Sequence, residues 1–342
     1  MIGIDDVRAA AARLAGYVTA TPLLASHALD ELCGVPVLCK AENLQRTGSF
    51  KLRGALNHVL SLSPAERAGG VIAASSGNHA QALAWAARLV GTYAVVVVPS
   101  DAPPAKVLSA KMLGAEVYYY ARGGDDRDTI VGEIARERGL AIVPSANSDE
   151  VIAGGGTVAA EILAQTDQVT TLVVPIGGGG LAAGCAVAAK ALNPNVRVIG
   201  VEPEYGADTA LSLREGRRVS IPTPATIADG LTHRTPAPLP FDINRAFLDQ
   251  VVTVSDAEII EAMAVAFNYL RVVVEPSGAC GLAAAICERI EITSGTMGVV
   301  LSGGNIALDP FRSLVGRAAA AGGDGGVPGL HARGGQQSAG TA

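Results

Sequence analysis

Along the chain, apolar runs of strand length alternate with alanine-rich stretches that have the composition of helices. His79–Val90 and Leu181–Leu192 are examples of the helical stretches. Strands and helices that alternate in this way build a parallel sheet through right-handed crossovers. The sequence therefore predicts an α/β fold. The expected strands are Val35–Cys39, Gly70–Ala74, Tyr93–Val98, Glu116–Tyr120, Thr171–Val174, Val196–Val201 and Gly298–Leu301.

Charge and composition exclude several classes of partner. The net charge is −6, whereas nucleic-acid binding needs clustered Lys and Arg. The uncharged stretch from Thr171 to Ala189 contains Pro175 and four glycines, which a lipid-exposed helix of about 20 residues would not carry. The N-terminus shows no signal peptide, and five cysteines without a CxxC pair fit a reducing compartment. We therefore expect a cytoplasmic protein with neither a nucleic-acid nor a membrane partner.

The first segment whose residues could take part in catalysis is TGSFKLRGA, residues 47–55. In it a polar turn leads into an expected helix. Lys51 lies near the first turn of that helix, where the positive end of the helix dipole disfavours an ammonium. A neutral amine can attack an aldehyde. Taken alone, a lysine between Phe50 and Leu52 is usually a surface residue.

Two further segments follow expected strands and precede expected helices. SSGNH, residues 75–79, presents backbone N–H groups and hydroxyls that suit a carboxylate, although an ordinary helix cap has the same composition. PIGGGGL, residues 175–181, can wrap its amides around a phosphate. The same glycines loosely match a dinucleotide-binding GxGxxG turn, with Glu202 ending a strand as that fold requires.

The fourth segment, LSGGN at residues 301–305, follows the last expected strand. It places the hydroxyl of Ser302 at the carboxyl edge of a sheet, where α/β proteins bind ligands. A plain glycine-rich turn is the alternative. None of the four segments is decisive by itself.

Together with IADGL (Ile227–Leu231) and VVEPSGA (Val273–Ala279), these segments resemble fold-type II enzymes that use pyridoxal 5′-phosphate (PLP). The resemblance is to the threonine/serine dehydratase (ammonia-lyase) and serine racemase family and spans about residues 5 to 310. It implies a tryptophan synthase β-like fold with two parallel-sheet α/β domains and the cofactor between them. Residues 1–52 and 148–315 would form the large PLP-binding domain, and residues 53–147 a small mobile domain.

The resemblance also implies roles for individual residues. Lys51 would carry the cofactor as an imine, with Phe50 packed beside the ring. Ser75, Ser76 and His79 would bind the substrate carboxylate or the reacting part of the substrate. The remaining cofactor ligands would be Asn78 at the 3′-oxygen, Gly177, Gly178, Gly179 and Gly180 at the phosphate, and Ser302 at the pyridine nitrogen.

The implied reaction is α,β-elimination, in which Lys51 removes the Cα proton and the β-hydroxyl leaves. A hydroxyl at the ring nitrogen, unlike a carboxylate, does not stabilise a pyridinium, so loss of the leaving group competes well against transamination. In racemase-like relatives the serine that corresponds to Ser76 is a second acid or base. Racemisation therefore remains open.

Further residues are candidates for substrate or metal binding because of their positions in segments that resemble the family. Arg127 and His233 are expected near the substrate side chain, although Arg127 also suits a solvated loop. Glu202, Gly206 and Asp208 match a segment that binds Mg²⁺ or Ca²⁺ in many relatives, since carboxylates and a carbonyl suit a hard cation. A solvated acidic loop is the alternative.

The expected function is that of a PLP-dependent lyase converting L-threonine, L-serine or another 3-hydroxy amino acid to a 2-oxo acid and ammonia. Serine racemase and 3-hydroxyaspartate dehydratase remain open on the same scaffold, and a nicotinamide-dinucleotide-binding protein is the alternative of another class. A homodimer is expected, as in relatives. The Gly- and Ala-rich residues 316–342 predict a disordered tail, which leaves no room for a C-terminal regulatory domain.

Overall fold

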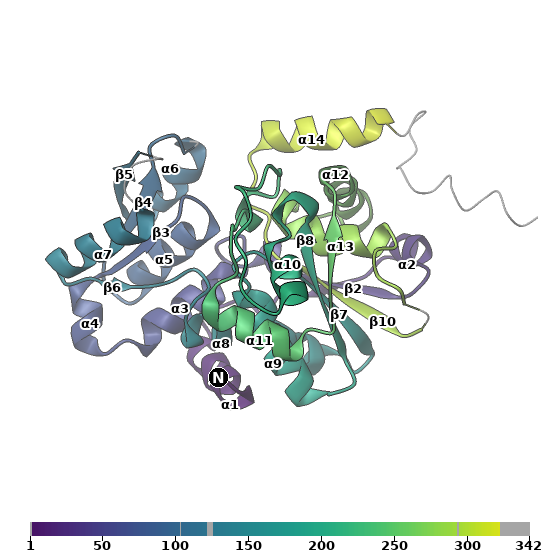
Figure 1. Ribbon diagram of the computed structural model, residues 1–342, viewed down its shortest axis with the longest axis horizontal. Coiled ribbons are helices and arrows are strands. Elements are labelled where there is room, and N and C mark those ends of the chain that lie inside the picture. Colours follow the sequence, from purple (N-terminus) through teal and green to yellow (C-terminus); the bar gives the residue numbers. More distant parts are fainter. Residues whose placement is uncertain (1, 103, 122–125, 293, 322–342) are drawn as a thin grey trace, which may run out of the picture.

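The computed structural model describes residues 2–102, 104–121, 126–292 and 294–321, and two sheets form its framework (Figure 1). The predicted α/β fold is confirmed. The strands are β1 (Leu23–Leu24), β2 (Val37–Ala41), β3 (Val71–Ala74), β4 (Ala94–Pro99), β5 (Glu116–Tyr120), β6 (Ala141–Ile142), β7 (Val169–Pro175), β8 (Arg197–Pro203), β9 (Gln250–Val254) and β10 (Thr296–Leu301).

Helices connect these strands. The α-helices are α1 (Ile4–Leu14), α2 (His27–Cys33), α3 (Lys51–Ser61), α4 (Pro64–Gly69), α5 (Asn78–Leu89), α6 (Pro104–Met112), α7 (Arg127–Arg138), α8 (Asp149–Gln165), α9 (Gly180–Leu192), α10 (Asp208–Glu215), α11 (Pro238–Phe247), α12 (Asp256–Val265), α13 (Pro276–Ile286) and α14 (Leu308–Ala321). The shorter ones are the 3₁₀-helices η1 (Glu42–Leu44), η2 (Glu204–Gly206) and η3 (Asp229–Leu231), and the π-helix η4 (Ala266–Leu270).

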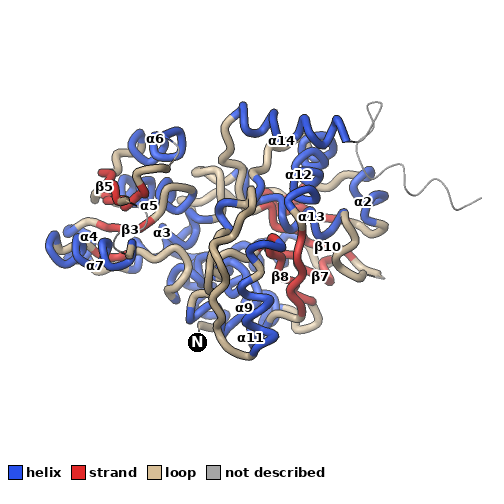
Figure 2. Tube along the Cα trace, turned by 45° about the horizontal axis from the view of Figure 1, so that its top comes forward, coloured by secondary structure: helices blue, strands red, loops and turns tan. Residues whose placement is uncertain are grey.

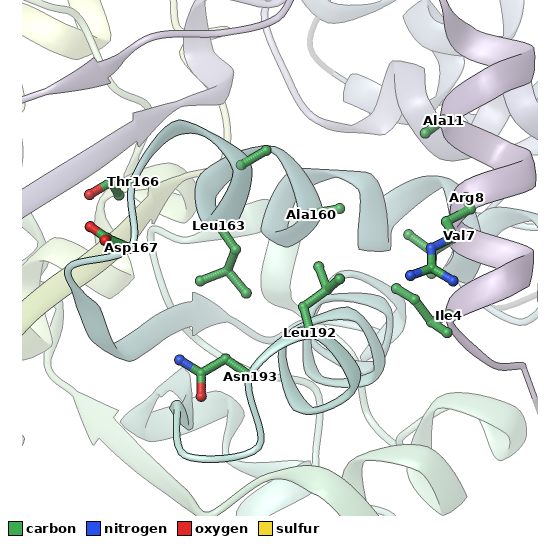
Figure 3. A pocket seen from close by; sticks show the side chains of 11 residues that line it. Ile4, Val7, Arg8, Ala11, Ala160, Leu163, Thr166, Asp167, Leu192 and Asn193 are labelled. Atoms are coloured by element: carbon green, nitrogen blue, oxygen red, sulfur yellow. The ribbon is translucent and has the colours of Figure 1, made fainter.

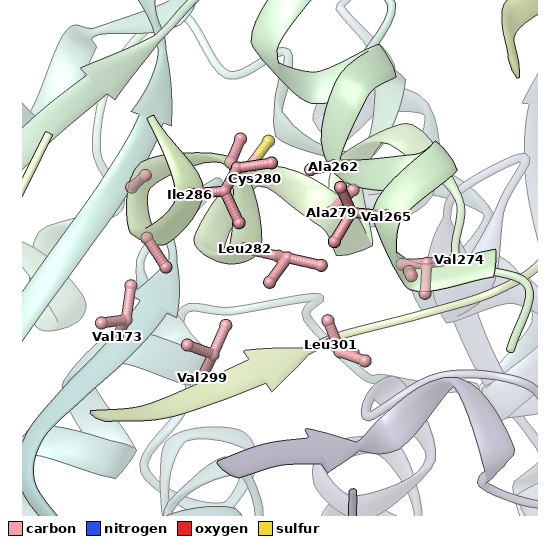
Figure 4. Close-up of a cluster of buried hydrophobic side chains, with 14 of the residues drawn as sticks. Val173, Ala262, Val265, Val274, Ala279, Cys280, Leu282, Ile286, Val299 and Leu301 are labelled. Carbon is pink, nitrogen blue, oxygen red and sulfur yellow. The ribbon is translucent and has the colours of Figure 1, made fainter. Parts of the chain in front are cut away.

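The large sheet has the strand order β1-β2-β10-β7-β8-β9, and of these described strands only β1, at the edge, runs antiparallel to its neighbour. Helices α2, α12 and α13 pack on one face, and α1, α8, α9 and α11 pack on the other. Figure 4 shows Leu282 of α13 facing Val173 and Val299 of the sheet. A parallel sheet covered on both faces explains why its strands are almost continuously apolar.

The small sheet has the order β5-β4-β3-β6, with every strand pair parallel. Its side chains alternate between two cores, as the period of a strand requires. Ile72 and Val95 contact α7, whereas Val71 and Val96 belong to the core formed with α3 and α5. Figure 2 shows this unit, with β3, α5 and α7, beside the larger one.

Seven of the ten strands found in the described ranges lie where the sequence predicts them, within a few residues. The sequence does not predict β1, β6 and β9, of which β1 and β6 have only two residues each. Helix α14 continues to Ala321, past residue 316 where the tail was expected to begin, because its alanine-rich end favours a helix. The remainder of the expected tail, residues 322–342, lies outside the described residues.

The chain passes from one sheet to the other in α3 and again before α8. Helix α3 packs against both α8 and α5, so it contacts both units. The predicted domain limits at residues 52/53 and 147/148 remain a prediction. Across the described ranges, no helix has the length and apolarity that crossing a bilayer requires.

Candidate active site

Lys51 is the first residue of α3, and backbone pairing holds that end of the helix against the end of β10. The N–H of Phe50 donates a hydrogen bond to the carbonyl oxygen of Ser302 at 3.0 Å. One residue earlier, Ser49 pairs with Gly303 in an isolated antiparallel bridge. The structure therefore brings Lys51 and Ser302 together at the carboxyl edge of the large sheet, where α/β proteins bind ligands.

The amine of Lys51 points to the segment that leads into α8. Its Nζ atom donates a hydrogen bond to the carbonyl oxygen of Ser145 at 2.9 Å and lies 5.1 Å from the centroid of the Phe50 ring. Burial lowers the pKa of Lys51 from 10.5 to about 8. An amine with this pKa is largely neutral under mildly alkaline conditions and is therefore available as a nucleophile or base. Ser145 was not among the predicted site residues.

The glycine turn lies between β7 and α9, as the sequence predicts. Gly179 is the N-cap of α9 and has a φ of 88°, in the left-handed region that favours glycine. A Cβ atom at any of the four positions would lie 2.9 to 3.1 Å from its nearest neighbour, so a larger residue would require that neighbour to shift; the positions are Gly177, Gly178, Gly179 and Gly180. The turn leads into the first N–H groups of α9, which suit an anion such as phosphate.

One short segment touches both the lysine and the glycine turn. Ser145 accepts the hydrogen bond from Lys51, and the next residue, Ala146, lies against the turn. A Cβ atom at Gly178 or Gly180 would be 3.0 or 3.1 Å from Ala146. The turn and the amine therefore belong to one site, as a ligand with both an aldehyde and a phosphate requires.

Asn78, at the start of α5, connects the small unit to the large one. Its Nδ2 atom donates to Oε1 of Glu275 at 2.5 Å, and its Oδ1 atom accepts from Nδ2 of Asn305 at 2.8 Å. Asn305 also donates to the carbonyl oxygen of Thr47 at 2.7 Å, close to the lysine segment. The sequence reasoning missed Glu275 and Asn305 as site residues, although both lie in the motifs VVEPSGA and LSGGN that carry the resemblance.

Ser75, Ser76 and Gly77 form the turn between β3 and α5, and His79 is the second residue of α5. Ser75 and Ser76 are half-buried, and Ser75 Oγ accepts the N–H of Gly77 at 3.2 Å. His79 is buried, and its Nε2 atom lies 2.9 Å from the carbonyl oxygen of Val143. Because a carbonyl only accepts, Nε2 carries the proton and Nδ1 the lone pair. The His79 side chain thus has no donor left for a carboxylate, and the first N–H groups of α5 are better placed for that task.

Burial and the positive charge of Lys51 lower the pKa of His79 to about 3. His233 is similar: burial, followed by the charges of Lys51 and Arg127, lowers its pKa to about 4. Both imidazoles are therefore neutral near pH 7. A Cβ atom at Gly177 or Gly178 would lie 3.2 or 3.1 Å from the His233 ring, so this side chain lies directly on the glycine turn.

Arg127 is the first residue of α7, directly after the cap Asp126. Its side chain is about half exposed and lies 3.3 Å from the carboxylate of Asp128. The influence of its charge on His233 places both residues in the same electrostatic neighbourhood as Lys51. The role of Arg127 and His233 at the substrate stays a prediction.

The predicted metal residues gather at the end of β8. Glu202 is fully buried and accepts the N–H groups of Thr209 and Ala210 at 2.9 and 2.8 Å. Asp208, the first residue of α10, is also buried, and neither of its carboxylate oxygens has a hydrogen-bond partner among the described residues. Burial raises the pKa of Glu202, and burial with the charge of Glu202 raises that of Asp208. Within the part of the chain that the structure describes, no cluster of three or more His, Cys, Asp or Glu side chains could hold a metal.

A surface hollow of about 450 Å³ lies elsewhere, between α1, α8 and α9 (Figure 3). Its lining is mainly aliphatic, with Ile4, Leu163 and Leu192, and Arg8 and Asp167 stand at its sides. None of the predicted site residues lines it. It has no part in the site around Lys51.

Comparison with known proteins agrees with this geometry. Residues 14–303 match the family described as pyridoxal-phosphate dependent enzyme. L-threo-3-hydroxyaspartate ammonia-lyase from Saccharomyces cerevisiae is 43% identical over 310 residues, which cover 91% of this chain and 95% of that protein. Serine racemase from Schizosaccharomyces pombe is 40% identical over 311 residues, which cover 91% and 96%.

The solved structure of maize serine racemase is similar throughout. It superposes with a TM-score of 0.88 at 38% sequence identity, covering 92% of this chain and 97% of that chain. The predicted resemblance is therefore confirmed over nearly the whole described part.

Proposed function

Because the chain belongs to the pyridoxal-phosphate dependent enzymes, we propose that it converts a small 3-hydroxy amino acid, such as L-threonine or L-serine, to a 2-oxo acid and ammonia. The observation that carries this proposal is the position of the Lys51 amine. It donates to Ser145, and the next residue, Ala146, packs on the glycine turn. The backbone just before the lysine, at Phe50, is bonded to that of Ser302. The family membership also argues against the dinucleotide-binding interpretation of that turn.

The residues present fit the cofactor. The glycine turn would hold its phosphate, Asn78 its 3′-oxygen, and Ser302 its ring nitrogen, while Lys51 would hold it covalently until substrate arrives. The bound cofactor supplies an electron-withdrawing ring that acidifies the Cα–H bond of the amino acid. The amine of Lys51, with its pKa lowered by burial, then removes the Cα proton as a general base.

The turn between the small sheet and α5 would orient the substrate. The N–H groups at the start of α5, with Ser75, would bind the substrate carboxylate. Residues 53–147 would act as a mobile domain that brings this turn onto the site and excludes water. The bonds from Asn78 to Glu275 and Asn305 support the proposal, since they join the two units beside the lysine.

Ser302 would favour elimination over other outcomes. A hydroxyl, unlike a carboxylate, would not stabilise a protonated ring nitrogen, so the bound cofactor would delocalise negative charge from Cα only weakly. Departure of the β-hydroxyl would therefore compete well against reprotonation at another carbon. Ser76 could deliver or remove a proton at Cα from the other side, so racemisation of serine is a second candidate activity, supported by the likeness to serine racemase.

The substrate side chain would face Arg127 and His233. The positive charge of Arg127 acts on His233, and a guanidinium on that side of the site would favour a second carboxylate on the substrate, as in 3-hydroxyaspartate. The 43% identity to an L-threo-3-hydroxyaspartate ammonia-lyase supports the same candidate. We propose 3-hydroxyaspartate as the alternative substrate to L-threonine and L-serine.

We propose that Glu202, Asp208 and the carbonyl of Gly206 would be the ligands if a hard cation such as Mg²⁺ or Ca²⁺ binds at this place. Two adjacent buried carboxylates, one of them without a hydrogen-bond partner among the described residues, are costly without a compensating charge. A cation would lower that cost by its charge. The test is thermal unfolding with added Mg²⁺ or Ca²⁺, compared with Asp208→Asn; an equal midpoint with and without either cation would exclude the site.

The assembly and location rest on the family resemblance alone. We propose a cytoplasmic homodimer, and sedimentation analysis of the purified chain tests its mass. None of the five cysteines, all of which lie within the described residues, forms a disulfide, which accords with a reducing compartment.

The proposed activity is tested by incubating the protein with a panel of amino acids and measuring the ammonia and 2-oxo acid released. L-threonine, L-serine and both threo and erythro 3-hydroxyaspartate are the informative members. We expect release of equal amounts of ammonia and 2-oxo acid from at least one of them, and none with Lys51→Ala. Lys111→Ala, which removes an exposed lysine of α6, is the matched control. A chain with no release from any member would contradict the proposal.

A further inference from the structure

Arg53 lies two residues after Lys51 and is completely buried. Its guanidinium makes two hydrogen bonds to the carboxylate of Glu42, both at 2.8 Å, and two to the carboxylate of Glu161, at 2.7 and 2.8 Å. It also donates to Thr157 Oγ1 at 3.2 Å and to the carbonyl oxygen of Thr19 at 3.3 Å. Every N–H direction of the guanidinium therefore has an acceptor.

These acceptors all belong to the large unit. Glu42 lies in η1, directly after β2, while Thr157 and Glu161 lie on α8 and Thr19 on the segment before β1. Lys40 of β2 is also fully buried and donates to Glu161 at 2.8 Å. The four charged residues, named here the Arg53 cluster, are Arg53, Lys40, Glu42 and Glu161. Their charges sum to zero.

The backbones of α3 and α8 touch at the same level. A Cβ atom at Gly54 would lie 2.9 Å from the carbonyl oxygen of Val151, and one at Gly154 would lie 2.5 Å from that of Arg53. Neither helix has room to slide across the other there. The first turn of α3 is thus fixed by contact of its backbone as well as by the hydrogen bonds of Arg53 to Glu42 and Glu161.

A purely stabilising role does not account for such an arrangement. Buried ion pairs lose about as much through desolvation as they gain by attraction, and apolar residues of the same volume often stabilise a fold equally well. What a guanidinium with two bidentate carboxylates does provide is one fixed geometry. The nearest residue for which a fixed geometry matters chemically is Lys51, whose four-carbon side chain has many rotamers and is oriented by its backbone.

We propose that Arg53 is a positioning residue, which fixes the first turn of α3 to the large unit so that the Lys51 amine keeps one position at the cofactor site. The rest of the small unit can then move for substrate while the backbone of Lys51 stays fixed to the large unit. This inference rests on the proposed function, because it takes Lys51 as the residue that binds the cofactor.

The test compares substitutions at the two positively charged residues of the Arg53 cluster, Arg53 and Lys40. Arg53→Met and Lys40→Met each delete one positive charge, while Arg53→Lys keeps the charge and loses the bidentate geometry. The cofactor-free chain is mixed with pyridoxal, which has the aldehyde but no phosphate, so that the glycine turn contributes little. The rate of covalent capture at Lys51 is followed by absorbance and scaled to the folded fraction measured by circular dichroism.

We expect Arg53→Lys and Arg53→Met to slow capture by at least about tenfold, because displacement of a reacting group by about 1 Å can cost about 100-fold. Lys40→Met should stay within about twofold of the unaltered chain after the same scaling. If Arg53→Met does not fold, the comparison of capture rates between Arg53→Lys and Lys40→Met is sufficient to test the positioning role.

Capture by Arg53→Lys at the unaltered rate, or equal slowing in the Arg53 and Lys40 variants, would overturn the positioning role and leave the proposed function intact. An unaltered chain that captures no pyridoxal at Lys51 would overturn the proposed function, and the positioning role with it.

Discussion

The Nζ atom of Lys51 lies 2.9 Å from the carbonyl oxygen of Ser145, a residue in the segment between the small sheet and α8. The lysine itself begins α3, next to the end of β10 in the large sheet. The reactive amine is thus placed by both units at once. Its chemistry should therefore depend on their relative position as well as on its own surroundings.

The first prediction concerns pH. Burial lowers the pKa of Lys51 to about 8, and only the neutral amine attacks an aldehyde. The neutral fraction rises with pH below the pKa and levels off above it. Covalent capture of pyridoxal by the cofactor-free chain should therefore rise with pH and level off above about 8, instead of continuing to rise toward 10.5. A rate that still climbs steeply between about pH 9 and 10 would show an unperturbed lysine.

The second prediction concerns substrate choice. Arg127→Ala should lower kcat/KM for 3-hydroxyaspartate by about 10- to 100-fold, since a hydrogen bond to a charged group contributes about 1.5–3 kcal/mol. L-threonine, without a second carboxylate, should change little. Arg136→Ala, on the same helix and exposed, is the control. Equal losses for both substrates would assign Arg127 a structural role.

The third prediction concerns Ser302. Ser302→Asp would place a carboxylate at the ring nitrogen and stabilise its protonated form. Elimination should slow by at least about tenfold, equivalent to about 1.4 kcal/mol in the barrier. A slow conversion of the cofactor to its amine form should appear, measurable by chromatography of the released cofactor. Unchanged elimination without that product would place Ser302 away from the ring nitrogen.

The fourth prediction separates racemisation from elimination. Ser76→Ala should reduce the interconversion of L- and D-serine by about 100-fold or more, the typical contribution of a general acid or base. Formation of 2-oxo acid from L-serine should persist, because Lys51 removes that proton. Chiral chromatography and a 2-oxo acid assay follow both reactions. Ser75→Ala is the control and should affect both reactions alike. If Ser76→Ala also slows racemisation and elimination equally, Ser76 has no separate role in racemisation.

Much of the fold could be predicted from the sequence because its strands are buried on both faces. Runs such as VVVV in β4 are apolar throughout, and turns of glycine and serine mark their ends. Strand β9 was missed because it is an edge strand with partly exposed residues, so its signal is weaker. Strand β6 has two residues, Ala141 and Ile142, and is defined only by their pairing with β3, which leaves no local pattern of its own.

The site was predictable only where one local motif carries the chemistry. Lys51 and the glycine turn stand out in the sequence, and the structure places both against the same segment, Ser145 and Ala146. Glu275 and Asn305 act through Asn78, about 200 residues away, and such a long-range contact leaves no local pattern. Arg53 also bonds to Glu161 on α8, 108 residues away, and this long-range contact likewise leaves no local pattern.

The most direct test of the central claim is reduction of the PLP-loaded chain with borohydride, followed by peptide mass spectrometry. Reduction makes the bond between lysine and cofactor permanent. The account predicts one modified peptide, with the added mass on Lys51, and no modification in Lys51→Ala. A cofactor mass on another lysine, or a chain that binds PLP without any borohydride-stable link, would contradict it.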